Sequence, residues 1–389
     1  MNLVFMRNKI IKRIILPAVL ILIIILFTGC TGWLRVFNSY DSTNQEKKVN
    51  SETTTEIETT ANEDTLSSEK NSLKDGENNN INTENSIITA DNILFTFIAA
   101  GDNRPANDIL PQPEVFIDLL GYIEKSNPSF FVSTGDIING NTDNQEIIKR
   151  QFLDYLNAAE VLSCINFIAP GNHDVANNTS KKYFLELINK QVFRQSELQD
   201  IQILEVESTK ADTIEGNDSN QVDNISFYYC FEFKDTYFVV LNGYEKGYWG
   251  AIKAEQLLWL EKLLEILIDK KVFIFIHPPV YSFLNPDCIT DGSIHVAFSS
   301  KKNQDYIREL FKKFKVDGVF SGHEHMYNKH DHDGTEYIIT GCSGAYPYTS
   351  EDEGGFYHFL KIEVKSDSWI LNVINRDGNL YYKEEISFN

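Results

Sequence analysis

Short apolar runs alternate with polar turns from residue 91 to the end of the chain. Six of these runs have the length of buried strands, and each ends in a burst of polar or glycine residues. They are ILFTFIAA then GDNR (93–104), SFFVST then GDIINGN (129–141), INFIAP then GNHD (165–174), TYFVVLN then GYEKG (236–247), KVFIFI then HPPVY (271–281), and DGVFS then GHEH (317–325). Five of the six ends carry Asp, Asn or His, which are metal-ligand types.

Between several of these runs, apolar residues recur at spacings of three and four, the period of an amphipathic helix. Residues 114–127 and 254–270 are examples. Strands that alternate with helices favour an α/β sandwich with helices over the sheets. Residues at the carboxyl ends of such strands converge on one edge, where α/β folds bind their ligands.

The end of the chain has a different pattern, in which apolar and polar residues alternate with a period of two. The stretches are 336–344, 356–365, 368–375 and 380–388, with turn residues between them. They predict strands that extend or close a second sheet. Residues 197–224 are polar and poorly patterned, so we expect them to form a surface excursion.

The first 30 residues have the layout of a secretory signal peptide. Residues 1–13 carry four basic residues and no acid, and an apolar run follows from Ile14 to Phe27. The segment Phe27-Thr28-Gly29-Cys30 resembles the lipobox of bacterial lipoproteins, with Phe27 where Leu is usual, and so predicts lipidation at Cys30. A retained helix that runs on through Trp33 is the alternative. Either anchor predicts an extracytoplasmic protein that is held at the cell membrane.

Residues 31–90, which we call the stalk, are rich in Ser, Thr, Asn and Glu and nearly without aromatic residues after Tyr40. Such a segment buries too little apolar surface to order itself, so we predict a disordered acidic stalk. The remaining residues, 91–389, are predicted to form a single domain that carries most of the net charge of −21. An acidic domain repels nucleic acid, whereas small phosphates neutralised by metal ions are not excluded as ligands. The sequence does not indicate the oligomeric state.

Cysteines are sparse in the predicted domain, at positions 164, 230, 288 and 342. In an oxidising compartment any of them could pair. None has CxxC spacing, so a zinc site built from thiolates is not expected.

The segment GHEHMYNKH (322–330) places His323 and His325 one residue apart, directly behind a predicted strand. Histidines at i and i+2 at the mouth of a sheet can reach neighbouring metal positions about 3.5 to 4 Å apart. A pair of divalent cations also needs a ligand that bridges them, and a single Asp at a strand end can do so. His330 and His332 follow in a predicted hairpin with Asp-Gly at its tip, and we expect them to be solvated.

The motifs resemble, in order and over roughly residues 93–345, those of the calcineurin-like metallophosphoesterase superfamily. They contain Asp102, Asp136, Asn172 with His173, His277, and His323 with His325. The stretches SGHEHMYNK, EQLLWLEKLL and YIITGCSGAYP are most similar to the purple-acid-phosphatase-like branch. The resemblance implies a four-layer α-β-β-α sandwich of two mixed sheets, with helices on the outer faces.

The resemblance also implies the roles of these residues. Asp136 bridges two divalent ions, chosen from Mn, Fe or Zn; Asn172, His277 and His323 complete one site, and Asp102 and His325 serve the other. His173 is then the proton donor or a phosphate contact. The implied chemistry is attack on phosphorus by a hydroxide that bridges the two metals.

This chain departs from the superfamily pattern at three places. Arg104 stands where a histidine is frequent, and it can reach a substrate phosphate or form a surface ion pair. Pro105 stands where purple acid phosphatases have a tyrosine, so the iron-tyrosinate colour is not predicted. Asn139, Gly140 and Asn141 replace the Asp-Arg-Gly of Ser/Thr protein phosphatases, which argues against that subfamily.

The function expected from these residues is an extracytoplasmic hydrolysis of small phosphate monoesters. A phosphodiesterase or nucleotidase that uses the same site is the second interpretation, since the motifs serve both. A metal-binding surface protein without turnover is the third, and Arg104 in place of a histidine supports it.

Overall fold

The computed structural model describes residues 92–198, 201–204, 226–245, 248–286 and 297–389. The predicted signal peptide, Cys30, the stalk, Cys288 and most of the surface excursion lie outside the described residues. The described residues belong to one compact unit. Within the described ranges, none of the helices combines the length and the apolarity needed to cross a membrane.

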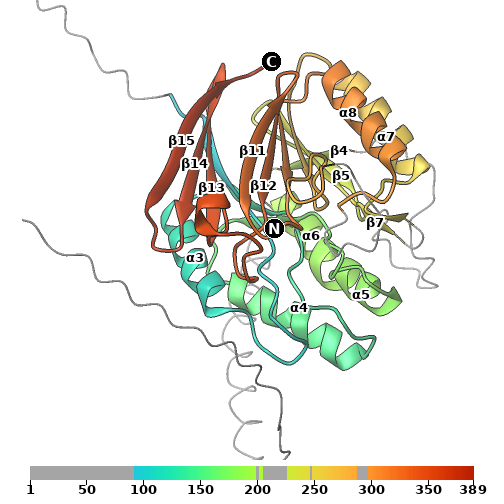
Figure 1. The fold of residues 1–389 in the computed structure, drawn as a ribbon, viewed down its shortest axis with the longest axis vertical. Helices are drawn as coiled ribbons and strands as arrows, with labels where there is room; N and C mark the ends of the chain where they lie inside the picture. Colours follow the sequence, from blue (N-terminus) through green and yellow to red (C-terminus); the bar gives the residue numbers. More distant parts are fainter. Residues whose placement is uncertain (1–91, 199–200, 205–225, 246–247, 287–296) are drawn as a thin grey trace, which may run out of the picture. The chain divides into compact units, whose positions relative to one another are not determined.

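Two mixed sheets form the centre of this unit (Figure 1). The first contains, in spatial order, β15 (Leu380–Ser387), β14 (Ser368–Asn375), β13 (His358–Val364), β1 (Phe95–Ala100), β2 (Phe130–Ser133) and β3 (Ile165–Ile168). The second contains β11 (Tyr327–His332), β12 (Thr335–Thr340), β10 (Gly318–Ser321), β9 (Lys271–Ile276), β6 (Thr236–Leu241), β5 (Tyr229–Phe233) and β4 (Gln202–Leu204). A separate ribbon pairs β7 (Tyr244–Glu245) with β8 (Tyr248–Trp249).

Helices cover the outer faces of both sheets. The first sheet is covered by α3 (Glu114–Lys125), α4 (Gln145–Ala159), α5 (Asn178–Tyr183) and the π-helical turn η1 (Phe184–Asn189), which runs into α6 (Lys190–Leu198). The second sheet is covered by α7 (Ala254–Ile266) and α8 (Lys301–Lys313), drawn side by side in Figure 1. A short 3-10 turn, η2 (Glu351–Glu353), precedes β13. The prediction of an α-β-β-α sandwich is therefore confirmed.

A core rich in phenylalanine holds the two sheets together. Along β1, Phe95, Phe97 and Ala99 face the other sheet, whereas Ile98 and Ala100 face the helices, as the period of two in a strand requires. The ring of Phe130 on β2 lies 4.9 Å from that of Phe238 on β6, edge to face. Each such ring contributes about 1.5 to 3 kcal/mol by leaving water, so this layer fixes the distance between the sheets.

The strands of the C-terminal end divide between the two sheets. The run 336–344 supplies β12, which joins the second sheet, whereas β13, β14 and β15 extend the first sheet as an antiparallel meander. The predicted hairpin is present between β11 and β12. Its tip is Asp333-Gly334, both with positive φ (58° and 86°), which is why an Asp-Gly pair suits this turn.

Two blocks of parallel strands place the site. In the first sheet β1, β2 and β3 are parallel, and in the second sheet β6, β9, β10 and β12 are parallel. Parallel strands bring their carboxyl ends to one edge of a sheet. The turns after these strands contain the motifs that the sequence singled out.

Candidate metal centre

The turns after β1, β2 and β10 hold three of the predicted ligands in an unusual backbone conformation. Asp102, Asp136 and His323 have φ of 56°, 56° and 70°, in the left-handed region that residues with a side chain seldom adopt. The glycine before each of them lets the strand turn sharply at this point. Such strained residues persist where the surrounding structure fixes them, and they cluster at functional sites.

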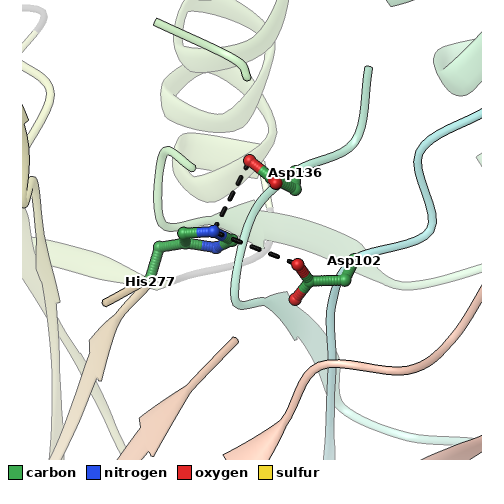
Figure 2. A group of neighbouring side chains, drawn as sticks. All are labelled: Asp102, Asp136 and His277. Carbon is green, nitrogen blue, oxygen red and sulfur yellow. Dashed lines mark ion pairs between the residues drawn. The ribbon is translucent and has the colours of Figure 1, made fainter. Parts of the chain in front are cut away.

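Asp102, Asp136 and His277 form the centre of the site (Figure 2). The Nε2 atom of His277 lies 3.5 Å from Oδ1 of Asp136 and 4.0 Å from Oδ1 of Asp102. Its Nδ1 donates a hydrogen bond to the carbonyl of Thr134 at 2.7 Å, so in the neutral imidazole Nε2 carries a free lone pair.

That Nε2 atom is buried and has no hydrogen-bond partner, while one ligand atom from each of the three residues lies within 4.8 Å of the others. An unpartnered acceptor beside two buried carboxylates is costly unless a cation joins them. Imidazole and carboxylate donors suit Zn, Mn or Fe. These residues therefore fit a divalent metal ion.

The two histidines of GHEH contact different residues of the site. His325 donates from Nδ1 to the carbonyl of Tyr346 at 2.8 Å, and its Nε2 lies 3.4 Å from Oδ1 of Asp102. Nδ1 of His323 lies 3.0 Å from Oδ1 of Asn172. His323 is thus paired with Asn172, and His325 lies beside Asp102. Their assignment as metal ligands stays a prediction.

A glycine lies directly beside each of the carboxylates of Asp102 and Asp136. A Cβ at Gly171 would lie 2.1 Å from Oδ1 of Asp136, and a Cβ at Gly322 would lie 2.4 Å from Oδ2 of Asp102. Real side chains never approach so closely, so the carboxylates keep these positions because both neighbours lack a side chain.

His173 and Arg104 flank Asp136 on the open side of the site. His173 Nε2 and Arg104 Nε lie 3.9 and 3.7 Å from Oδ2 of Asp136. Nδ1 of His173 is hydrogen-bonded to the carbonyl of Asn139, which orients its ring. Arg104 is 18% exposed, and its Nε has no hydrogen-bond partner. The arginine therefore lies beside Asp136 at the site, and its contact with a substrate phosphate stays a prediction.

Two buried acids of the motifs hold the backbone rather than the site. Asp174 accepts hydrogen bonds from the backbone N–H groups of Asp136, Gly171, Ile137 and Ile138 at 2.8, 2.8, 2.9 and 3.3 Å. Glu324 accepts from the hydroxyl of Ser282 and from the N–H groups of Phe283 and Leu284. Glu324 thus holds the backbone of residues 283–284 after β9.

Burial and neighbouring charges set the protonation of the site. Burial raises the pKa of Asp102 to about 8, with His277 opposing the shift and the Asp136 charge adding to it. Burial acts to raise the pKa of Asp136 as well, but His277, His173 and Arg104 together lower it below its usual value. Burial also lowers the pKa of His323 to about 3 and of His325 to about 4. These imidazoles are therefore neutral near pH 7, as metal ligation requires.

The sequence missed two tyrosines at this edge. The hydroxyl of Tyr244, the first residue of β7, lies 3.3 Å from Nδ1 of His323. Tyr348 stacks on His325 with ring centroids 3.8 Å apart, and its side chain is hydrogen-bonded to that of Arg104. Tyr244 lies in the segment that follows one of the six strand runs, so its position in the sequence pointed to the site. Its residue type did not, because tyrosine is not among the metal-ligand types that the motifs contain.

Among the residues that the structure describes, the remaining histidines and cysteines are not part of the group of ligand candidates. His330 and His332 lie on β11, where His332 stacks on Tyr281 at 3.8 Å. His358 is buried and hydrogen-bonded to Phe356 and Thr340, and the ring of Tyr327 packs beside it. Among the described residues Cys164, Cys230 and Cys342 are free thiols.

Comparison with known proteins places the chain in a family. The family described as calcineurin-like phosphoesterase matches residues 106–327, more than half of the chain. The chain belongs to this family, which typically uses two divalent metal ions, and is thereby a metal-dependent phosphoesterase by family. A search of curated protein sequences found no match.

Two solved structures share the fold. A dimetal phosphatase from Danio rerio aligns with a TM-score of 0.54 and 15% identity, over 76% of this chain and 100% of that one. A purple acid phosphatase from yellow lupin, Lupinus luteus, aligns with a TM-score of 0.50 and 16% identity, over 75% of this chain and 53% of that one. At these identities the likeness concerns the fold alone, and it agrees with the two mixed sheets described above.

Proposed function

We propose that this chain is an extracytoplasmic phosphohydrolase that uses two divalent metal ions to hydrolyse small phosphate monoesters. The observation that carries the proposal is the convergence of Asp102, Asp136, His277 and His325 with the Asn172–His323 pair at one edge. Two divalent ions held there would supply Lewis acidity, which acidifies water and offsets the charge of the phosphate.

The residues on the open side of the site favour a monoester. A monoester dianion carries one more negative charge than a diester, and it gains more from a nearby guanidinium. Arg104 is turned inward with an unpartnered Nε, and Tyr348 holds its side chain in place. A guanidinium fork in this position can bind two phosphate oxygens that are not esterified.

His173 is placed to handle the proton of the leaving group. Because its Nδ1 is bonded to a backbone carbonyl, Nε2 is the atom that faces the site. In the imidazolium form Nε2 can give a proton to the departing ester oxygen, and in the neutral form it can accept one.

We also propose that the enzyme is tethered outside the cytoplasm, through a lipid on Cys30 or a retained helix. The support is the layout of residues 1–30, followed by the stalk that we predict to be flexible. A tether of this kind would hold the domain at the membrane and leave the site accessible to soluble substrates.

A metal-binding protein without turnover is an alternative that one observation favours. Arg104 Nε lies 3.7 Å from Asp136, so a permanent cation already neutralises part of the charge that would attract metal. On this alternative at most one ion binds tightly.

Metal content and hydrolysis on the same preparation test the proposal. Mass spectrometry counts the metal ions, and aryl phosphate monoesters and diesters are assayed with added Mn, Fe, Zn or Ca. We expect two ions per chain and faster turnover of the monoesters. Faster diester turnover would make the enzyme a phosphodiesterase, and one ion or none without turnover would establish the binding protein.

A further inference from the structure

The loop that follows β12 is fastened to the metal centre by backbone hydrogen bonds. The N–H of Ala345 donates to the carbonyl of Asp102 at 2.7 Å, and the N–H of Tyr348 donates to the carbonyl of His325 at 3.0 Å. The carbonyl of Tyr346 accepts from Nδ1 of His325 at 2.8 Å. Because β12 is parallel to β10, its carboxyl end delivers this loop to the same edge as the two histidines.

Two aromatic side chains on this loop remain open to solvent. Tyr346 is 82% exposed, the largest exposed fraction among the large hydrophobic side chains of the described residues. Tyr348 is 42% exposed, although its ring lies against His325 and its side chain is hydrogen-bonded to Arg104. A lone exposed tyrosine is common on protein surfaces. Here two such rings, which we call the tyrosine pair, belong to a backbone that is fixed on a metal-ligand candidate.

The contact between Tyr348 and Arg104 indicates what this loop could bind. A phosphate held by Arg104 would lie next to the side chain of Tyr348, and its ester group would extend toward the exposed loop that carries Tyr346 and Tyr348. Aromatic rings on a rigid backbone bind planar groups by stacking at a low cost in conformational entropy. An alkyl group of the same size gains less binding energy at such rings, because it has no flat face to stack on them.

We propose that Tyr346 and Tyr348 form a subsite for a planar aromatic leaving group, so that the preferred substrates are phosphate monoesters that carry a nucleobase or an aryl ring. This inference rests on the proposed function, because it names the substrate class of that same site. The reaction is the hydrolysis proposed above: water supplies the new oxygen on phosphorus, the ester P–O bond breaks, and the leaving oxygen departs as an alcohol.

Two pairs of matched substrates test the subsite in the full-length protein with its metals supplied. Benzyl phosphate and cyclohexylmethyl phosphate both release a primary alcohol of similar size, and only the first is planar. Adenosine 5′-monophosphate and ribose 5-phosphate share the same ester oxygen, and only the first carries a base. Within each pair, the ratio of kcat/KM values isolates the contribution of the ring.

The variants Tyr346→Ala and Tyr348→Ala should lower this ratio by about fivefold or more, which is the usual size of one lost stacking contact. Tyr346→Phe keeps the ring and should retain the ratio. Tyr306→Ala removes another exposed tyrosine, on helix α8 over the outer face of the second sheet, and serves as the matched control. Tyr348→Ala should also slow all four substrates, because it releases Arg104 and His325, and the ratio corrects for that loss.

Each outcome decides the matter. A lower ratio for the nucleotide pair alone assigns the subsite to a nucleobase, and a lower ratio for the benzyl pair alone assigns it to an aryl ring. Turnover with ratios unchanged in both tyrosine variants would overturn the subsite and leave the proposed function intact. No turnover of any of the four esters by the unmodified protein would refute the proposed function, and the subsite with it.

Discussion

Replacing Asp174 by asparagine tests how the central carboxylate is held in place. The carboxylate of Asp174 is fully buried and accepts four backbone hydrogen bonds, two on each oxygen. Asparagine has the same shape but offers one oxygen and one NH2 group, so two of the four N–H groups would face a donor. A buried N–H without an acceptor costs about 1 to 3 kcal/mol. Asp174→Asn should therefore lower the free energy of unfolding by about 2 to 6 kcal/mol.

Urea unfolding measures this loss, and metal content gives a second readout. One of the four bonds goes to the N–H of Asp136 itself, so the variant should also bind metal more weakly. Asp154→Asn on α4 is the matched control, because Asp154 is a third exposed and pairs with Arg150 at 3.7 Å. Such surface pairs contribute at most about 1 kcal/mol. A loss below about 1 kcal/mol in Asp174→Asn, with metal content unchanged, would refute the anchoring role.

Four further changes follow from the same structure. Gly171→Ala should abolish metal binding, because its Cβ would lie 2.1 Å from Oδ1 of Asp136. The control Gly121→Ala on α3 meets no atom within 4 Å and should stabilise the helix by about 0.5 to 1 kcal/mol. Equal metal content in the two variants would contradict the close packing of Gly171 against Asp136. His173→Ala should retain its metals, measured by mass spectrometry, and slow alkyl esters more than aryl esters, because alkoxides need a proton to leave; equal slowing would remove the proton-transfer role. Burial lowers the pKa of His358 to about 4, so its contribution to the free energy of unfolding is complete above pH 6.5, and about 3 kcal/mol of it is lost as pH falls to 4. His358→Gln should therefore make the free energy of unfolding, measured with urea, less dependent on pH between 6.5 and 4. An unchanged pH dependence in this variant would disprove the assignment. Cys30→Ser should reduce the mass of the mature protein by the lipid and release it from membranes, whereas unchanged mass and attachment would support a retained helix.

Much of the fold could be predicted from the spacing of apolar residues within single strands and helices. The period of two along β1 and the period of three to four along α3 and α7 reflect which faces are buried, so these elements lie where the sequence predicts them. Their ends are less predictable. The run 254–270 has a helical pattern throughout, yet α7 stops at Ile266, because the chain turns there into β9 through Asp269, whose φ is 59°.

The ligand candidates were predictable because each follows a strand in a motif of several residues. The groups that orient them were not, because three of these are backbone carbonyls. Thr134, Asn139 and Tyr346 orient His277, His173 and His325 through their C=O groups. Every residue has a carbonyl, so its use depends on tertiary placement and leaves no mark in the sequence. Asp174 shows the converse: its type suggests a partner for the adjacent His173, but its carboxylate points to backbone N–H groups instead.

The strained backbone at Asp102, Asp136 and His323 connects the fold to the chemistry. A left-handed residue other than glycine costs of order 1 to 3 kcal/mol. Each of these three positions is stabilised by hydrogen bonds from its neighbours: the N–H of His323 donates to both oxygens of Asp102, and the N–H of His173 donates to Oδ1 of Asp136. The carboxylate of one strand end thus fixes the turn of another strand, across the two sheets. Because Asp102 and His323 belong to different sheets, a change in the sheet packing must change the spacing of the ligands, and the phenylalanine layer between the sheets thereby contributes to the geometry of the metal centre.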